Sequence, residues 1–201
     1  MLGDDLSVGL RVPSFQILPL GNEDASLFGD LNIVLKYAVV NRPDAMLSSG
    51  LVIAAPTGLI PAAVIPKGES RSLVHPTVLQ PWLGYYWCSG DFFVHGFCSV
   101  MVPTDSEDVT QLFNDVGVGY YLFQGPGWVR AVIPTFEVHV NTPLTHRRSD
   151  DPFRVGDSIN LTTGTSIFLG ERVSLGVAFG VPVTGPKVFD YEALANLNVR
   201  F

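Results

Sequence analysis

Hydrophobic and polar residues alternate along most of this chain, most clearly at its C-terminal end. Over residues 190–201 the odd positions from Tyr191 to Val199 are apolar, and the even positions are mostly polar, from Glu192 to Arg200. A period of two places successive side chains on opposite faces of a β-strand. A strand of about ten residues with one apolar face is typical of transmembrane barrels. We interpret the final Phe201 as the residue that such a strand presents to the barrel-assembly machinery.

The same pattern predicts ten strands and no helix. In 172–183, for example, Val173, Val177 and Phe179 share a face opposite Ser174 and Gly176. The expected strands lie at about 5–13, 31–40, 47–56, 73–88, 92–102, 111–123, 128–141, 158–169, 172–183 and 190–201. The predicted fold class is all-β: one antiparallel up-and-down transmembrane β-barrel domain over residues 1–201, with about ten strands visible.

The connectors between these strands alternate in length. Those at 41–44, 89–91, 124–127 and 170–171 are short, whereas those at 14–30, 57–72, 103–110, 142–157 and 184–189 are mostly longer. Short turns at one end and long loops at the other are typical of transmembrane barrels. This places both termini at the short-turn end. Aromatic residues lie near the ends or middles of predicted strands, among them Trp82, Trp87 and Trp128, and some of them are candidates for an interfacial girdle.

Composition fits this picture and excludes one class of partner. Only 15% of residues are charged and 47% are hydrophobic, and the net charge of −7 argues against nucleic-acid binding. The longest apolar stretch, 51–66, contains Pro56 and Pro61 and does not predict a spanning helix. The N-terminal residues lack a secretory signal, so a barrel requires that the signal is missing through truncation or processing.

No residue pattern predicts catalysis or a cofactor. Cys88 and Cys98 define neither a disulfide framework nor a metal site, because a tight turn at Gly90-Asp91 puts Cys98 opposite about position 83. His95 and Ser99 are four residues apart, about 13 Å along a strand, too far for a direct hydrogen bond. We therefore expect no enzyme activity, no cofactor and no metal.

Polar residues fall on the face that a barrel would turn toward its lumen. Strand 128–141 puts Glu137, His139 and Asn141 on one face, and further strands add Asn32, Lys36, Asn160, Glu192, Asn196, Asn198 and Arg200. An interior with both signs of charge would pass or bind small solutes. Alternatively, these side chains pair with one another across a filled, non-conducting interior.

Several segments resemble a known family. Residues 29–37 (GDLNIVLKY) with the following APTG at 55–58, LFNDVGVGY at 112–120, FEVHVNTP at 136–143 and VTGPKVFD at 183–190 are similar to outer-membrane transporters of the phenol meta-pathway degradation family. The resemblance covers about three quarters of the chain. It implies a signal peptide, a further strand pair, and so a complete barrel of 10–12 strands.

The sequence thus predicts an outer-membrane β-barrel channel or transporter, in contact with the lipid bilayer, for small solutes, with hydrophobic or aromatic ones among the candidates. Transport of such solutes is implied by the resemblance and not by any motif. Two alternatives stay open. One is a structural outer-membrane barrel with a filled lumen, and the other is a soluble β-sandwich or lipocalin-like binding protein, whose apolar faces would point inward.

Overall fold

Antiparallel strands make up the regular structure of this chain. A computed structural model describes residues 5–17, 25–58, 76–106, 108–148, 156–185, 187 and 189–200. The described residues contain strands and no helix, and hence no helix long and apolar enough to cross a membrane. Phe201 and the apolar segment 59–66 lie outside the described residues, so the hypotheses on them stay predictions.

The strands follow the alternation of the sequence closely. Ten of them correspond to the ten expected segments: β1 (Leu6–Arg11), β4 (Leu31–Asn41), β5 (Ala45–Ala55), β6 (Val78–Ser89), β7 (Phe92–Pro103), β8 (Gln111–Tyr120), β10 (Val129–Pro143), β11 (Ser158–Leu169), β12 (Val173–Thr184) and β13 (Glu192–Val199). Two short strands, β2 (Ser14–Ile17) and β3 (Ala25–Phe28), occupy part of a predicted connector. The expected strand 111–123 ends at Tyr120, and β9 (Phe123–Gln124) follows separately.

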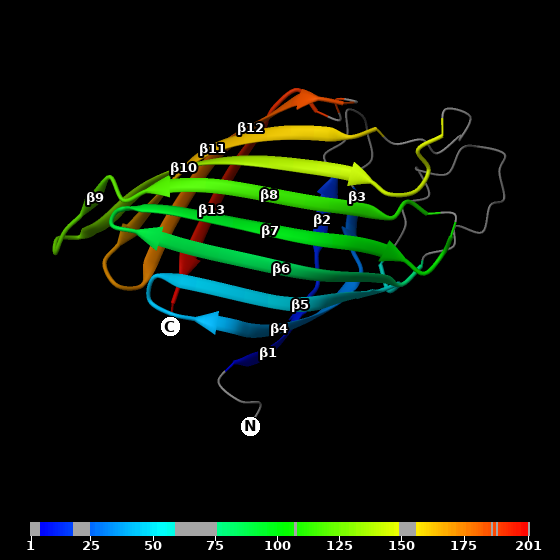
Figure 1. The fold of residues 1–201 in the computed structure, drawn as a ribbon, viewed down its shortest axis with the longest axis horizontal. Coiled ribbons are helices and arrows are strands. Elements are labelled where there is room, and N and C mark those ends of the chain that lie inside the picture. Colours follow the sequence, from blue (N-terminus) through cyan, green and yellow to red (C-terminus); the bar gives the residue numbers. More distant parts are fainter. Residues whose placement is uncertain are drawn as a thin grey trace.

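The main sheet is antiparallel and runs up and down. Its order is β1-β4-β5-β6-β7-β8-β10-β11-β12-β13, with β9 paired to β10, and β2 and β3 form a separate hairpin. Figure 1 shows this sheet curled, with β4 to β8 in front and β11 to β13 passing behind them. Among the described residues, β1 and β13 are the two free edges, so the sheet is not closed.

Most connectors alternate in length as predicted, but the one between β8 and β10, expected to be a short turn at 124–127, spans 121–128 and contains β9. Residues 42–44, 90–91 and 170–172 are short turns, while 56–77, 104–110 and 144–157 are long. Gly90 and Gly170 adopt φ values of 62° and 58°, the left-handed conformation that tight turns require and that glycine tolerates. The chain enters β1 and leaves β13 at the short-turn end, because Leu6 pairs with Tyr37 and Val199 pairs with Val173.

The sheet has two chemically different faces. The inner face carries Glu137 and His139 of β10 and contains the buried side chains of Phe93, Ser99 and Ile133. The outer face carries large apolar side chains that are more than a third exposed: Leu6, Val8, Leu10, Tyr37, Leu79, Leu83, Trp87, Phe92, Val102, Val116, Val118, Tyr120, Phe136, Leu175, Val177, Phe179, Leu197 and Val199.

Charged residues of the sheet are confined to one side. Among the described strand residues that have register partners, the charged and histidine side chains all belong to the inner face: Arg11, Lys36, His95, Asp115, Glu137, His139 and Glu192. The outer face of these paired residues carries no charge. A face that exposes apolar side chains without charge is expected to contact an apolar environment or a partner.

The register also gives the tilt of the strands. One row of paired residues crosses the sheet from β5 to β13 in seven strand steps. It begins at Ala45, beside a short turn, and ends at Ala193, which lies six residues away from Val199 at the short-turn end. At about 3.3 Å per residue and about 4.8 Å between strands, this stagger corresponds to a tilt of roughly 30°. Strands of closed barrels are tilted slightly more, by about 35–45°.

The two cysteines are separate, as the turn geometry predicted. Cys88 pairs with Phe93 and Cys98 pairs with Leu83 on neighbouring strands, and both thiols are free. Trp82 differs from the prediction of an aromatic girdle, because its ring lies on the inner face and stacks on Phe97 with ring centroids 5.9 Å apart.

Candidate functional site

A cluster of imidazoles and carboxylates lies on the inner face of β7, β8 and β10. His139 Nδ1 is 2.9 Å from Asp115 Oδ1, and His139 Nε2 is 3.0 Å from the Thr162 hydroxyl. Because an ionised carboxylate only accepts hydrogen bonds, Nδ1 of His139 carries the hydrogen and donates it to Asp115. In neutral His139 the Nε2 atom then accepts from Thr162, so the ring is held at both nitrogens.

Glu137 joins this cluster to a second histidine. Its Oε1 lies 3.7 Å from His95 Nε2, and its Oε2 lies 3.6 Å from His139 Nε2. These separations fit ion pairs when the imidazoles are protonated, but they are too long for hydrogen bonds. Glu137 therefore bridges two histidines that come from β7 and β10.

A glycine between the two strands makes this bridge fit. His95 pairs with Gly117, and Gly117 pairs with Glu137, so the three residues form one row across β7, β8 and β10. A Cβ atom at Gly117 would overlap the His95 ring and lie 2.9 Å from Glu137 Cγ. The missing side chain leaves the space in which His95 and Glu137 meet.

The same row continues to a further carboxylate. Glu137 pairs with Thr162, Thr162 with Gly180, and Gly180 with Glu192 of β13. A Cβ atom at Gly180 would lie 3.4 Å from the Thr162 hydroxyl and 3.9 Å from Glu192 Cβ. Gly180, the second glycine of this row, therefore leaves the side chains of Thr162 and Glu192 uncovered.

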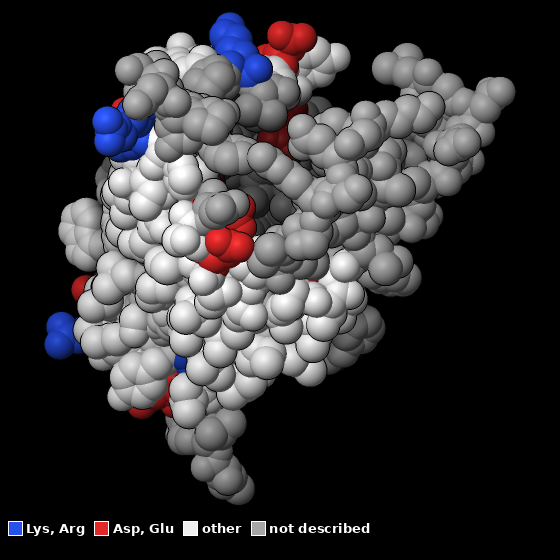
Figure 2. Space-filling view, turned by 90° about the vertical axis from the view of Figure 1, so that its right-hand side faces the viewer, with Lys and Arg blue, Asp and Glu red and all other residues white. Residues whose placement is uncertain are grey.

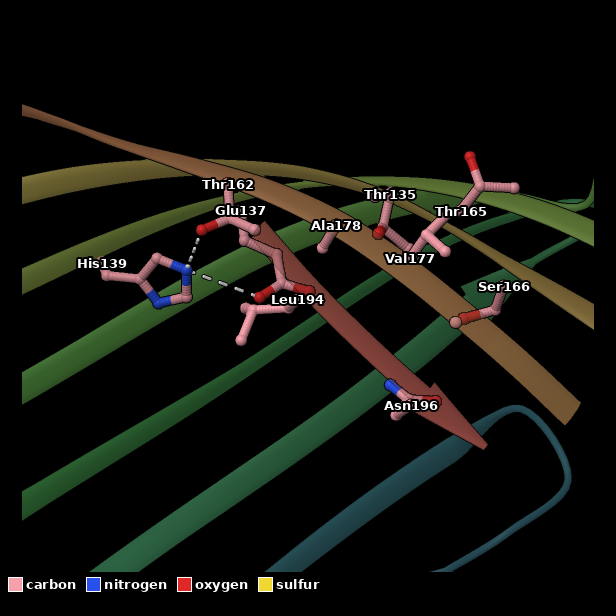
Figure 3. A pocket seen from close by; sticks show the side chains of 12 residues that line it. Thr135, Glu137, His139, Thr162, Thr165, Ser166, Val177, Ala178, Leu194 and Asn196 are labelled. Atoms are coloured by element: carbon pink, nitrogen blue, oxygen red, sulfur yellow. Dashed lines mark hydrogen bonds and ion pairs between the residues drawn. The ribbon is translucent and has the colours of Figure 1, made fainter. Parts of the chain in front are cut away.

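A cavity of about 250 Å³ opens beside this cluster. Its inner-face lining comes from four neighbouring strands: Thr135, Glu137, His139, Thr162, Gly164, Ser166, Gly176, Ala178, Leu194 and Asn196. Figure 3 shows Glu137 and Thr162 directed toward His139, with Leu194 and Asn196 contributed by β13. Hydroxyl groups, one carboxamide and one carboxylate give the cavity a polar wall.

No protein-family model matches the chain, and no curated protein matches it significantly. The resemblance to the phenol meta-pathway degradation family therefore remains a prediction. The fold and the inner-face cluster have to be interpreted from their own geometry.

The register places all but one of the predicted lumen residues on one face but not at one site. Glu137 and His139 lie in the cluster, Asn160 pairs with His139, Asn196 lines the cavity, and Glu192 ends the row. Four others lie apart from the cluster on the same face: Asn32 and Lys36 on β4, Asn141 toward the long-connector end of β10, and Asn198 at the short-turn end of β13. Arg200 follows Val199, the last paired residue of β13, so the register does not place it on either face.

Sequence reasoning missed the partners that complete the cluster. Asp115, His95 and Thr162 all contact Glu137 or His139, and none of them was among the predicted lumen residues. Alternate glycines at Gly117 and Gly119 were a usable signal, because glycine inside a strand often marks a close approach of neighbouring groups. Among the described residues, no group of three or more histidine, cysteine or acidic side chains is arranged to hold a metal ion.

Proposed function

We propose that the chain is the wall of an outer-membrane β-barrel that passes small solutes along its polar inner face. The observation that carries this proposal is the separation of the two faces. Most exposed large apolar residues of the paired strands lie on the outer face, with Met46 and Leu194 on the inner one, and the charged residues of the paired strands lie on the inner face. Lipid-facing apolar and lumen-facing polar residues alternate in this way in transmembrane barrels.

The dimensions of the strands support the same proposal. β4 and β5 have 11 residues each. At about 3.3 Å per residue and a tilt of roughly 30–45°, such strands cross about 25–31 Å along the barrel axis. The apolar band of outer-membrane barrels is about 25 Å tall.

Aromatic side chains at the short-turn end add a second line of support. Trp87, Phe92, Tyr120, Phe123 and Trp128 are between 42% and 75% exposed near the short connectors of β6 to β10. Aromatic girdles lie at the interfaces of transmembrane barrels, because amphipathic rings prefer the level of the lipid headgroups.

Closure of the sheet belongs to the proposal. The path from β1 to β13 has ten strands, so its two edge strands run antiparallel to each other and are able to pair directly. Open strand edges in lipid are costly because their backbone groups stay unpaired. We therefore expect β1 and β13, or further strands between them, to close the wall in a membrane.

Conductance tests the passage of solutes. The folded protein, inserted into a planar lipid bilayer, is expected to give discrete current steps, and liposomes that contain it should swell in a permeant solute. Figure 2 views the end with the long connectors, where an entrance is expected. A detergent-stable barrel without current steps would contradict passage.

The second candidate is the structural barrel with a filled lumen. Aromatic rings pack against each other near β6 and β7, where the centroid of the Phe93 ring lies 5.4 Å from that of the tilted Tyr86 ring and 5.7 Å from that of Tyr121, which meets it edge-on. These contacts favour a packed interior on that side. The soluble β-sandwich or lipocalin-like alternative, whose apolar faces would point inward, does not account for the large apolar side chains that are exposed on the outer face.

A further inference from the structure

We propose that the cavity beside Glu137 binds small organic ammonium ions and makes the interior selective for cations. This inference deepens the proposed function, on which its transport part rests. It follows from the charge around the cavity, the hydrogen-bonding capacity of its wall and its size.

The charge around the cavity is negative whatever the state of the histidines. Asp115, Glu137 and Glu192 supply three carboxylates around His95 and His139. Even two protonated imidazoles leave one negative charge uncompensated. Neither lysine nor arginine is among the described residues that line the cavity. Carboxylates that line a pore favour the entry of cations.

The lysine and the arginine that the register places on the inner face lie on other strands. Arg11 pairs with Asn32, and Lys36 pairs with Gly50, on the first strands of the sheet. In the described sheet the strands β5 to β8 separate them from β10, whereas closure of the wall would put β1 beside β13. Neither Arg11 nor Lys36 lines the cavity, so the charge next to the cavity is not compensated by them.

The wall of the cavity presents acceptors that an ammonium ion satisfies. Both oxygens of Glu137 lie beyond hydrogen-bond distance from the histidine nitrogens, at 3.6 and 3.7 Å. The hydroxyls of Thr135 and Ser166 and the Asn196 carboxamide add further oxygens. An ionised carboxylate accepts and never donates, so a ligand with charged N–H donors complements this wall.

The size of the cavity restricts the ligand. Its volume of about 250 Å³ is below the about 300–1,000 Å³ of sites for drug-sized ligands. An amine of a few carbon atoms fits this space. A bulky or polyanionic solute is excluded by volume and by charge.

The reversal potential in a potassium chloride gradient tests the selectivity. The wild-type protein in a planar bilayer is expected to favour potassium over chloride, and Glu137→Gln should lower this ratio by roughly twofold or more. Glu171→Gln is the matched control, because Glu171 lies in a short turn, 80% exposed and paired with Arg130. It should leave the ratio unchanged. If Glu137→Gln does not fold, Glu192→Gln takes its place.

Calorimetry on the wild-type protein folded in detergent tests the site without any transport. n-Propylammonium chloride is expected to bind, and Glu137→Gln should abolish binding. Tetramethylammonium, with the same charge but no N–H donors, should bind more weakly. Absence of n-propylammonium binding, or a pore without cation preference, overturns the inference. If the protein gives no channel current, the proposed passage of solutes fails. The calorimetric binding experiment then tests the ammonium site by itself.

Discussion

Glycine at position 117 determines whether the inner-face cluster forms. His95 and Glu137 come from strands that are not neighbours, and they meet only because β8 carries no side chain between them. Gly117 allows this contact because it has no side chain, and not through any chemical group of its own. The same relation holds at Gly119, where a Cβ atom would overlap the ring of Phe93.

Replacement of Gly117 by valine is expected to separate His95 from Glu137 and to destabilise the folded protein. Forcing added bulk into a packed site costs about 1–3 kcal/mol. Urea unfolding in detergent, followed by tryptophan fluorescence, measures this loss. Gly127→Val is the matched control, because a Cβ atom at Gly127 meets no atom within 4 Å. Equal stability of the two variants would show that the cluster does not depend on the gap at Gly117.

Residue chemistry alone was insufficient to predict the cluster. The alternation placed Glu137 and His139 on the correct face, because a strand period of two is a local property. Asp115 was missed because its pairing with His139 depends on the register between β8 and β10. Their connection, 121–128, contains β9 and is irregular, so the sequence does not fix that register.

At the level of the strands, the alternation of apolar and polar residues was sufficient to predict most of the fold. Strands of 8–15 residues with one apolar face were predicted within a few residues of their bounds. The four-residue strands β2 and β3 were missed because each is too short to show a period. Trp82 was one candidate for a girdle, but it faces inward; the alternation did not decide its face, since β6 carries aromatic residues on both faces.

Two neighbouring hydroxyl residues of β11 allow a direct test of which face meets lipid. Thr165 pairs with Val177 on the outer face, and Ser166 pairs with Gly176 on the inner face. Thr165→Lys is expected to destabilise the folded protein in liposomes by about 2–4 kcal/mol if this position lies near the bilayer midplane. Ser166→Lys, the matched control, points its charge into the polar interior and should fold with a smaller loss.

Denaturant titration in liposomes, followed by gel mobility, measures both variants. An equal loss at both positions would contradict the assignment of an outer, lipid-facing side. A larger loss of stability for Ser166→Lys would reverse the assignment. It would favour a protein whose interior is the apolar side that does not tolerate a charge.

At the scale of the whole molecule, a membrane-spanning barrel requires that the sheet closes on itself. The curled sheet in Figure 1, its tilt and its two chemically distinct faces all fit a barrel, while β1 and β13 are free edges among the described residues. Closure depends on long-range pairing between chain ends and on the lipid that penalises open edges. Neither contribution is contained in the local alternation from which the strands were predicted.

Heat modifiability shows whether the strands close into a barrel that is stable in detergent. The chain is refolded in detergent, and its mobility on a gel is compared before and after boiling. A closed barrel keeps its hydrogen-bonded wall in detergent until it is boiled, so we predict that the unboiled protein runs at a different position from the boiled one. A protein that is folded and soluble without detergent, and shows no shift, would contradict the membrane-barrel account.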